Sequence, residues 1–235
     1  MPVPPDSADP SRALSRHHLR RLRQYYRSAG WPCRDNVDLE LLEQGLVRRS
    51  HSPDGGLDSI VVTDAGIEAL GRYLEGNRNA LADHESLVET VSRYLLQQKR
   101  LVFRRVSFRV RGEARWTFSR PDVFSLRQVT SGRRLAPLVH EVKVRRADLL
   151  GDLKNEAKRR GYQSYCQAFY YVLAEGIAEP AEIPADCGVM IASGAALKVV
   201  RHPPHREATL TTRHWLALAR AQPERLDEDD PQLAL

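Results

Sequence analysis

The sequence is poor in cysteine and contains no long apolar run, and each absence excludes a class of protein. Its three cysteines, Cys33, Cys166 and Cys187, are odd in number and widely spaced, and no two form a C-x-x-C pair. This argues against a disulfide framework and a zinc site, so we expect reduced, structural thiols. No apolar run approaches the roughly 20 residues that a membrane-spanning helix requires. The composition therefore indicates a globular protein without a membrane segment.

The first residues also lack the apolar stretch of a signal peptide. We therefore expect a cytoplasmic protein. Residues 1–10 include four prolines and show no apolar periodicity, which predicts disorder. Because 42% of the 235 residues are hydrophobic, the rest of the chain has material for one large domain or two modest ones.

Positive charge is concentrated in one part of the chain. Residues 1–80 contain 11 basic and 11 acidic residues, whereas residues 81–223 contain 24 and 14, an excess of +10. Residues 224–235 contain 1 basic and 5 acidic residues and form an acidic tail. The basic segment favours a polyanion as partner, and nucleic acid over membrane, because no basic amphipathic helix with a large apolar face is evident. A solvated basic surface is the alternative that charge alone leaves open.

Residues 11–80 have the element order of a small winged-helix-like domain. Helical spacing in "SRALSRHHLRRLRQYYRSAG" and "NVDLELLEQGLVRR" is followed by a strand, a Pro-Asp-Gly-Gly turn, a return strand and the helix "TDAGIEALGRYL". The stretch "LLEQGLVRRSHSPDGGLDSIVVTDAGIEAL" also resembles the wing region of bacterial winged-helix regulators. The resemblance implies that the second helix enters the major groove. That helix carries four acids that would repel phosphates, which favours a positioning or protein-contact role: Asp35, Asp38, Glu40 and Glu43.

Residues 81–223 are expected to form a second domain after a linker at residues 76–80. A helix, "DHESLVETVSRYLLQQKR", precedes three β-rich runs, "LVFRRVSFRV", "RWTFSRPDVFSL" and "LAPLVHEVKV". A long polar helix over residues 147–167 follows, then the strand "AFYYVLA", the hairpin strands "CGVMIAS" and "LKVVRHP", and the helix "TTRHWLALARAQ". This order predicts an α/β core with a mixed sheet.

The run "PLVHEVKVRRADLL" contains the residues that point to chemistry. Glu141 and Lys143 lie two positions apart in a predicted strand, so their side chains point to the same side. The pair is either a solvated strand edge or a site. Asp122 follows a proline at the start of the preceding predicted strand. Pro-Asp also occurs in ordinary turns, so the alternative to a functional role is a turn.

In this order and context, Pro121–Asp122 and Glu141–Lys143 resemble the signature of the PD-(D/E)XK nuclease superfamily. The resemblance implies a restriction-endonuclease-like αβββαβ core. It also implies a Mg²⁺ site, with Mn²⁺ as a possible substitute, formed by Asp122, Glu141 and the carbonyl of Val142. Lys143 would then orient the metal-bound water or stabilise the hydroxide that attacks a DNA phosphodiester.

The likeness extends to the MmcB family of bacterial DNA-repair proteins, putative endonucleases of this superfamily. It covers "VHEVKVRRADLLGDLK", "YQSYCQAFYYVL" and "CGVMIAS", which supply seven further positions of the family pattern: Asp148, Asp152, Lys154, Tyr162, Tyr165, Cys166 and Phe169. A short insertion around "NEAKRRG" departs from the pattern and adds Lys158, Arg159 and Arg160, which would suit phosphate contact. The N-terminal domain is also outside the pattern.

Several further residues are candidates with open alternatives. Glu89 is a candidate third acid on the helix before the sheet, in competition with Glu85, and its alternative is a solvated helix acid. Gln163 is a candidate for steadying the substrate phosphate, and its alternative is a solvated amide on the surface. Arg145 and Arg146 follow the β-strand and are candidate DNA contacts. The arginines before Asp122 are expected to hold phosphates rather than read bases: Arg104, Arg105, Arg109, Arg111, Arg115 and Arg120.

The remaining polar candidates are expected to be structural. His84 and His140 have no evident partner, and Tyr162, Tyr165 and Cys166 are expected to face the core. The sequence therefore predicts a Mg²⁺-dependent DNA endonuclease that acts in repair or on unusual DNA structures. The alternative is a winged-helix DNA-binding or adaptor protein with a catalytically silent second domain and a protein partner at its N-terminal domain. The oligomeric state is not predicted.

Overall fold

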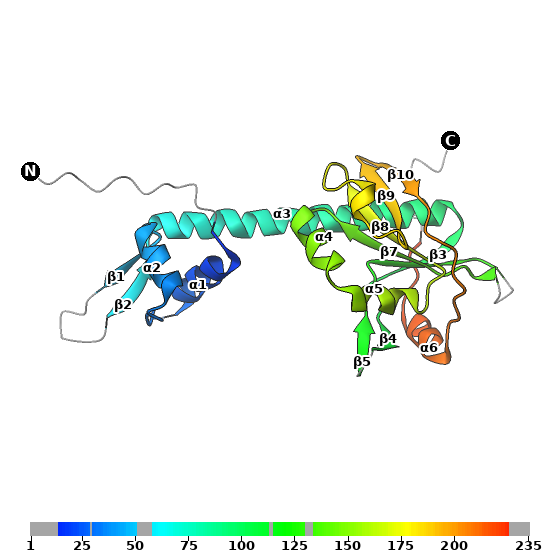
Figure 1. Ribbon diagram of the computed structural model, residues 1–235, viewed down its shortest axis with the longest axis horizontal. Coiled ribbons are helices and arrows are strands. Elements are labelled where there is room, and N and C mark those ends of the chain that lie inside the picture. The colour runs from blue at the N-terminus through cyan, green and yellow to red at the C-terminus, as the bar shows by residue number, and fades with distance from the viewer. Residues whose placement is uncertain (1–13, 29, 51–57, 113–114, 130–133, 226–235) are drawn as a thin grey trace, which may run out of the picture. The chain divides into compact units, whose positions relative to one another are not determined.

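The computed structural model describes residues 14–28, 30–50, 58–112, 115–129 and 134–225 (Figure 1). The chain divides into two compact units between Asn79 and Ala80. The predicted disorder of residues 1–10, the predicted turn within residues 51–57 and the acidic tail beyond Arg225 lie outside the described residues. None of the helices in the described ranges is long and apolar enough to cross a membrane.

The first unit consists of helices and one hairpin. Its elements are α1 (Arg16–Arg27), α2 (Asn36–Glu43), β1 (Val47–Ser50), β2 (Ser59–Val62) and the first part of α3 (Asp64–Gln97). The hairpin is antiparallel, with Val47 opposite Val62. Leu22 and Tyr25 of α1 pack with Leu41 and Ile60 in one apolar cluster. The predicted order of helices and hairpin strands is confirmed.

One acidic residue of α2, Asp38, is buried in the first unit, and two others near it are paired. Asp38 is only 3% exposed, and its carboxylate accepts hydrogen bonds from the Tyr25 hydroxyl at 2.6 Å and from the N–H of Cys33 at 2.8 Å. Asp35 caps α2 and pairs with Arg21 at 2.7 Å, while Glu40 lies 2.6 Å from His18 Nε2. The expectation that these carboxylates face a bound phosphate is therefore wrong for Asp38.

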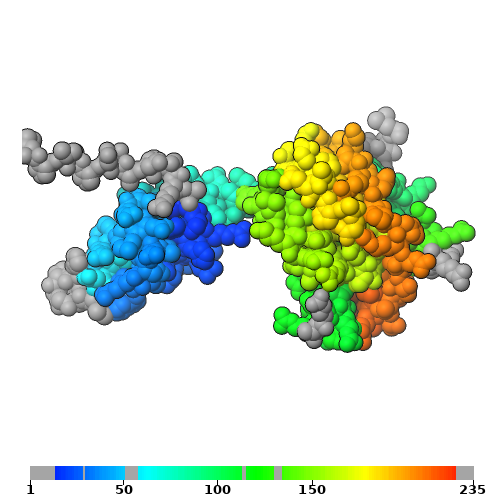
Figure 2. Space-filling model, viewed as in Figure 1, coloured from blue at the N-terminus to red at the C-terminus, as the bar shows by residue number. Residues whose placement is uncertain are grey.

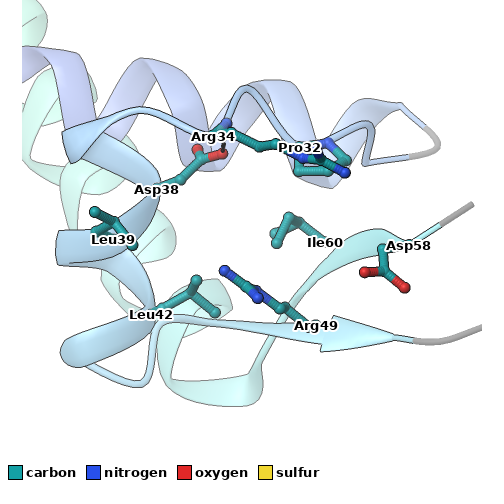
Figure 3. A pocket seen from close by; sticks show the side chains of 8 residues that line it. All are labelled: Pro32, Arg34, Asp38, Leu39, Leu42, Arg49, Asp58 and Ile60. Carbon is teal, nitrogen blue, oxygen red and sulfur yellow. Dashed lines mark hydrogen bonds between the residues drawn. The ribbon is translucent and has the colours of Figure 1, made fainter.

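A hollow of about 370 Å³ opens between α2 and the hairpin (Figure 3). Arg49 of β1 reaches into it between Leu42 and Ile60, and Asp58 lies at its open side. Its walls combine aliphatic side chains with charges of both signs, so the hollow shows no preference for an anion.

Helix α3 is continuous over 34 residues, so the predicted linker at residues 76–80 is wrong. The only breaking residue at that point is Gly76, and no proline occurs between Asp64 and Gln97. One glycine costs a helix interior about 1 kcal/mol, which the surrounding helix formers outweigh.

The second unit is built on a six-stranded mixed sheet in the order β10-β9-β8-β7-β6-β3. Its strands are β3 (Arg100–Arg104), β6 (Val123–Arg127), β7 (Leu138–Lys143), β8 (Ala168–Ala174), β9 (Gly188–Ser193) and β10 (Ala196–Arg201). The β7–β8 and β8–β9 pairs are parallel and the others are antiparallel. The predicted α/β class and mixed sheet are confirmed, and β7, which carries Glu141 and Lys143, lies in the interior of the sheet.

Two of the predicted strands are each split in two. The first run breaks at Arg105, which has a left-handed backbone with φ +59°, and the second breaks at Pro121, which has no N–H for a ladder. The released pieces, β4 (Phe108–Arg111) and β5 (Trp116–Ser119), pair with each other as a separate hairpin. The predicted helix over residues 147–167 is likewise two helices, α4 (Arg146–Leu153) and α5 (Glu156–Gln163), because Asn155 caps α5.

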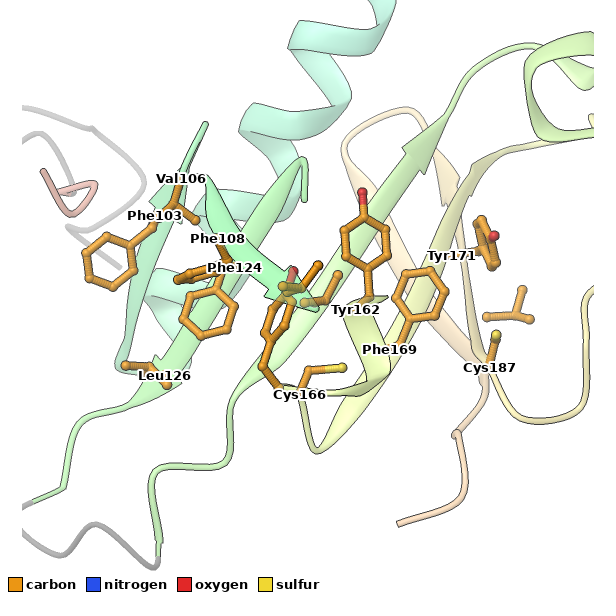
Figure 4. Packing of buried hydrophobic residues seen from close by; sticks show 14 of the residues in the cluster. Phe103, Val106, Phe108, Phe124, Leu126, Tyr162, Cys166, Phe169, Tyr171 and Cys187 are labelled. Atoms are coloured by element: carbon orange, nitrogen blue, oxygen red, sulfur yellow. The ribbon is translucent and has the colours of Figure 1, made fainter. Parts of the chain in front are cut away.

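An apolar cluster covers each face of the sheet. On one face, Val88, Val91 and Leu95 of α3 pack with Val142 and Val172. On the other face, an aromatic cluster extends across the strands (Figure 4). It includes Phe108, Phe124, Tyr162, Phe169 and Tyr171, and Leu218 of α6 (Thr212–Arg220) joins it. Tyr162, Tyr165 and Cys166 are buried in this cluster, as predicted.

His140 points to the α3 side of β7, where its ring stacks on Tyr170 with centroids 5.3 Å apart. It is 1% exposed, and its Nδ1 has no hydrogen-bond partner among the described residues. Burial, and to a smaller extent the positive charge of Arg100, lowers the pKa of His140 to about 3. His140 is thus neutral in the folded protein, in agreement with its predicted structural role.

We expect Gly30→Ala to destabilise the first unit. Gly30 has φ +71°, and an added Cβ would lie 1.9 Å from the carbonyl oxygen of Ile60. The left-handed backbone alone costs an alanine about 1–2 kcal/mol. Gly71→Ala is the matched control, because a Cβ there meets nothing within 4 Å and alanine favours the helix. Urea unfolding should give lower stability for the first variant and equal or higher stability for the second; equal stabilities would contradict the close approach at Gly30.

His140 should make the second unit less stable as the pH falls. An unfolded histidine takes up its proton near pH 6.5, but His140 in the fold does so only near pH 3. Between these values the unfolded state binds more protons, so the stability should decrease by up to about 1.4 kcal/mol per pH unit. His140→Phe keeps a ring against Tyr170 and should remove this dependence of the unfolding free energy on pH, measured by urea titration at several pH values. His17→Phe, a substitution at an exposed histidine, should leave the dependence in place. Identical slopes in wild type and His140→Phe would show that His140 does not titrate in this way.

Candidate functional site

Glu141 and Lys143 are buried charges on an interior strand. β7 lies between β6 and β8, and the two residues are 3% and 9% exposed. Alternation along the strand places them on the same face as Val139, the face of the aromatic cluster. The alternative of a solvated strand edge is therefore excluded, and the chain must compensate these charges internally.

The compensation comes from α5 as well as from β7 itself. Glu141 Oε1 accepts hydrogen bonds from Lys143 Nζ and Lys158 Nζ, each at 2.6 Å. Glu141 Oε2 accepts one from the Tyr162 hydroxyl at 2.9 Å. Lys158 was predicted as a surface phosphate contact, but the structure places its ammonium on this buried carboxylate.

A second carboxylate completes the arrangement. Asp152 of α4 accepts hydrogen bonds from Lys158 and from the Tyr171 hydroxyl, the latter at 2.7 Å, and Lys143 Nζ lies 3.8 Å away. Glu141, Lys143, Asp152 and Lys158 together form what we call the β7 charge cluster. Its two acids and two amines match in number, so each buried carboxylate has an amine partner.

The contacts in and around the cluster shift the pKa values of Asp152, Lys158 and Tyr162. Burial opposes the ionisation of Asp152, but the ammonium groups of Lys143 and Lys158 outweigh it, so the pKa of Asp152 is lowered. Burial likewise opposes the charge on Lys158, but the carboxylates of Glu141 and Asp152 raise its pKa. Burial and the charge of Glu141 raise the pKa of Tyr162, so its hydroxyl remains a hydrogen-bond donor.

Asp122 lies beside this cluster, just before β6. Its Oδ2 accepts a hydrogen bond from the backbone N–H of Val142 at 2.7 Å, beyond the last β6–β7 pair, Val123 with His140. The side chain of Asp122 therefore fixes the end of β7 at the residue between Glu141 and Lys143. His84 Nε2 of α3 lies 3.4 Å from the same oxygen. This contact raises the pKa of His84 against the opposing effect of burial.

A cleft of about 510 Å³ opens at Asp122, and we call it the Asp122 cleft. Three of the predicted phosphate contacts line it: Arg104, Arg105 and Arg120. Glu85 also lines it and pairs with Arg105 at 3.1 Å. Glu89 is not among the lining residues and pairs with Arg93 at 3.2 Å on the exposed side of α3. Between the two helix acids, the structure places Glu85 at the cleft.

The other predicted contacts are engaged elsewhere. Gln163 donates a hydrogen bond to Asp186 at 2.8 Å rather than pointing to Glu141. Arg146 pairs with Glu182 at 2.7 Å, Arg160 pairs with Glu156 at 3.0 Å, and Arg159 donates to the carbonyl of Leu153. Arg145 occupies the N-cap position of α4. The structure therefore does not gather these basic residues around Asp122.

Only part of this site could be read from the sequence. Asp122, Glu141 and Lys143 are recognisable by their spacing, but the partners His84 and Tyr171 carry no local signal. Asp152 was noted only as one position of a motif, without a role. Among the described residues, no three His, Cys, Asp or Glu side chains are gathered as a set of metal ligands.

Lys158→Gln should destabilise the second unit by about 1–3 kcal/mol, because it leaves two buried carboxylates with one ammonium. This range is below that of a fully buried pair because the Lys158 side chain is 31% exposed. Arg160→Gln on the same helix is the matched control, since an exposed i,i+4 pair contributes only about 0.3–0.5 kcal/mol. Urea unfolding measures both variants. An equal, small effect of the two substitutions would show that the charge cluster does not depend on Lys158.

Comparisons with known proteins leave the family of this chain open. No family model matches the chain, and no curated protein matches it. A search of solved structures finds a protein of unknown function from Silicibacter pomeroyi. It is 24% identical, with a TM-score of 0.39, over 55% of this chain and 77% of that one.

Proposed function

We propose that the second unit is a metal-dependent nuclease that hydrolyses DNA phosphodiester bonds in repair or in the processing of unusual DNA structures. The observation that carries the proposal is the placement of Asp122. Its carboxylate holds the backbone between the buried Glu141 and Lys143, and it opens onto a cleft with three arginines. The proposal includes the finer fold assignment, a restriction-endonuclease-like core of the MmcB type after a winged-helix-like unit.

The donor set fits Mg²⁺ or Mn²⁺ better than zinc. Asp122 and Glu141 offer hard carboxylate oxygens, and Mg²⁺ commonly uses one or two carboxylates together with water and substrate phosphates. The three cysteines lie apart from this site: Cys33 is in the other unit, and Cys166 and Cys187 are buried in the aromatic cluster. When bound, the cation would stabilise charge on the scissile phosphate and lower the pKa of a bound water.

The chain's own residues would then act as follows. Asp122 and Glu141 would hold the cation, with the carbonyl of Val142 between them. Glu141 would first have to release an ammonium group, because both Lys143 and Lys158 now occupy its Oε1. Lys143 would be free to orient the attacking water, and the arginines of the Asp122 cleft would hold the phosphates on either side.

The rival function, a DNA-binding or adaptor protein, gains one argument from the first unit. Asp38 is buried and Asp35 and Glu40 are paired, so α2 is less repulsive to DNA than its sequence suggests. This observation concerns the first unit only. It is compatible with a nuclease whose first unit contacts DNA or a protein partner.

The nuclease proposal predicts that Asp122→Asn and Lys143→Gln each reduce cleavage by about 100-fold or more, because each removes a group that acts at the reacting phosphate. Cleavage should require Mg²⁺ or Mn²⁺ and stop with EDTA. The measurement is cleavage of duplex, flap, branched and single-stranded DNA by the full chain. Glu156→Gln, an exposed acid paired with Arg160 on α5, is the matched control and should cleave at the wild-type rate.

Two further results would decide the details. Folded Asp122→Asn and Lys143→Gln variants that cleave at the wild-type rate would refute the nuclease proposal. Glu85→Gln and Glu89→Gln, compared in the same assay, separate the two helix acids. We expect a loss only with Glu85→Gln, because Glu85 shares the cleft with Asp122.

A further inference from the structure

The β4–β5 hairpin exposes a face of alternating arginine and aromatic side chains. On β4, Arg109 and Arg111 are exposed while Phe108 and Val110 point into the core. The strand pairing places Phe118 opposite Arg109 and Trp116 opposite Arg111. Phe118 is 66% exposed and Trp116 is 39% exposed, so the outer face of the hairpin presents two aromatic rings to solvent.

Helix α6 lies beside this hairpin and extends the surface (Figures 1 and 2). The guanidinium of Arg213 lies 4.3 Å from the ring centroid of Trp116, and that of Arg109 lies 5.2 Å from it. Between the hairpin and α6 is a groove of about 420 Å³, which we call the hairpin groove. Residues that line it include Ser107, Arg109, Phe118, Arg213, Leu216 and Arg220.

The arginines of the hairpin groove differ from Arg104 and Arg105 of the Asp122 cleft in their partners. Arg104 and Arg105 in the Asp122 cleft are paired with Glu224 and Glu85. In the described part of the chain, no carboxylate lies within ion-pair distance of the groove arginines or of their neighbour on β4: Arg109, Arg111, Arg213 and Arg220. Among the described residues, the groove therefore concentrates positive charge without an acidic partner next to the exposed ring of Phe118. Such a surface suits an anionic ligand that also has flat apolar parts.

The hairpin groove and the Asp122 cleft share one lining residue. Ser107 lines both, and Arg120 of the cleft donates a hydrogen bond to Ser107 Oγ at 3.4 Å. A ligand that passes Ser107 would therefore contact the linings of both the groove and the cleft that contains Asp122.

We propose that the hairpin groove binds a single-stranded segment of nucleic acid and leads it to the Asp122 cleft. The inference rests on the proposed nuclease function and specifies its substrate class. Phe118 provides a ring for base stacking, while Trp116 positions the guanidinium groups of Arg109 and Arg213 for the phosphates. Only an unpaired strand offers free base faces to such a ring, because the bases of a duplex are already stacked on one another.

Two other occupants fit the groove less well. A second copy of this chain would bring the same uncompensated arginines together across a two-fold interface, which is unfavourable. An acidic protein segment would satisfy the arginines but would leave the exposed ring of Phe118 without a planar partner. Both remain distinguishable outcomes of the experiment below.

The test is binding of the full chain, in EDTA so that no cleavage occurs, to a fluorescent oligothymidylate and to an abasic oligonucleotide of the same length. Phe118→Ala should weaken binding of the oligothymidylate about tenfold and should barely change binding of the abasic strand, because only the former can stack. Arg213→Gln should weaken both and reduce the salt slope by about 0.7. Trp215→Ala is the control, since Trp215 lies on the same helix, is 42% exposed and is not among the residues that line the groove.

Each outcome decides the inference. Unchanged affinity of Phe118→Ala for both strands would overturn it, as would an equal loss for both, which would indicate charge alone. A dimer in sedimentation that Phe118→Ala dissociates, with oligonucleotide affinity unchanged, would assign the face to self-association instead. Because binding is measured without metal, intact Phe118-dependent binding with no cleavage in Mg²⁺ would refute the nuclease proposal and leave this inference standing.

Discussion

The structure of the second unit depends on the burial of Glu141 inside a central strand. A carboxylate in this position cannot be hydrated, so each of its oxygens must receive donors from the chain. Lys143 supplies one from the same strand, and Lys158 and Tyr162 supply others from α5. The second amine in turn requires a second acid, Asp152. The charge balance of β7 therefore determines where α4 and α5 must pack against the sheet.

The same strand explains how the Asp122 cleft arises. The β6–β7 ladder ends at Val123 and His140. Beyond this pair, the carboxylate of Asp122 accepts the hydrogen bond of the next N–H on β7, that of Val142. Pro121 and the left-handed Arg105 release β4 and β5 from the main sheet at this point. The opening left beside Asp122 is lined by α3 and by the two strand breaks. The missing N–H of Pro121 and the left-handed backbone of Arg105 thus account for both the cleft and the separate β4–β5 hairpin.

Charge is organised differently in these two places. In the β7 charge cluster and the Asp122 cleft, most cations have an acidic partner, so a ligand that binds there must displace internal ion pairs. In the hairpin groove, the arginines are arranged around Trp116 and have no acidic partner among the described residues. A strand captured first by the hairpin groove could then supply the phosphate that exchanges with the internal ion pairs of the cleft.

The sequence by itself determined the α/β class and the mixed sheet, because hydrophobic periodicity is a local property. Short spacings also marked Asp122, Glu141 and Lys143 as candidate site residues, which stays a prediction. It did not determine that α3 is continuous or that Arg105 and Pro121 divide two strands. These outcomes depend on whether a residue that disfavours a helix or strand is outweighed by the hydrogen bonds and packing that the rest of the element gains. Only the tertiary structure decided that Lys158 belongs to a buried cluster rather than to the surface, and that Trp116 meets Arg213. Those contacts join residues from different elements, and the requirement to neutralise buried charge acts only when the elements are packed together.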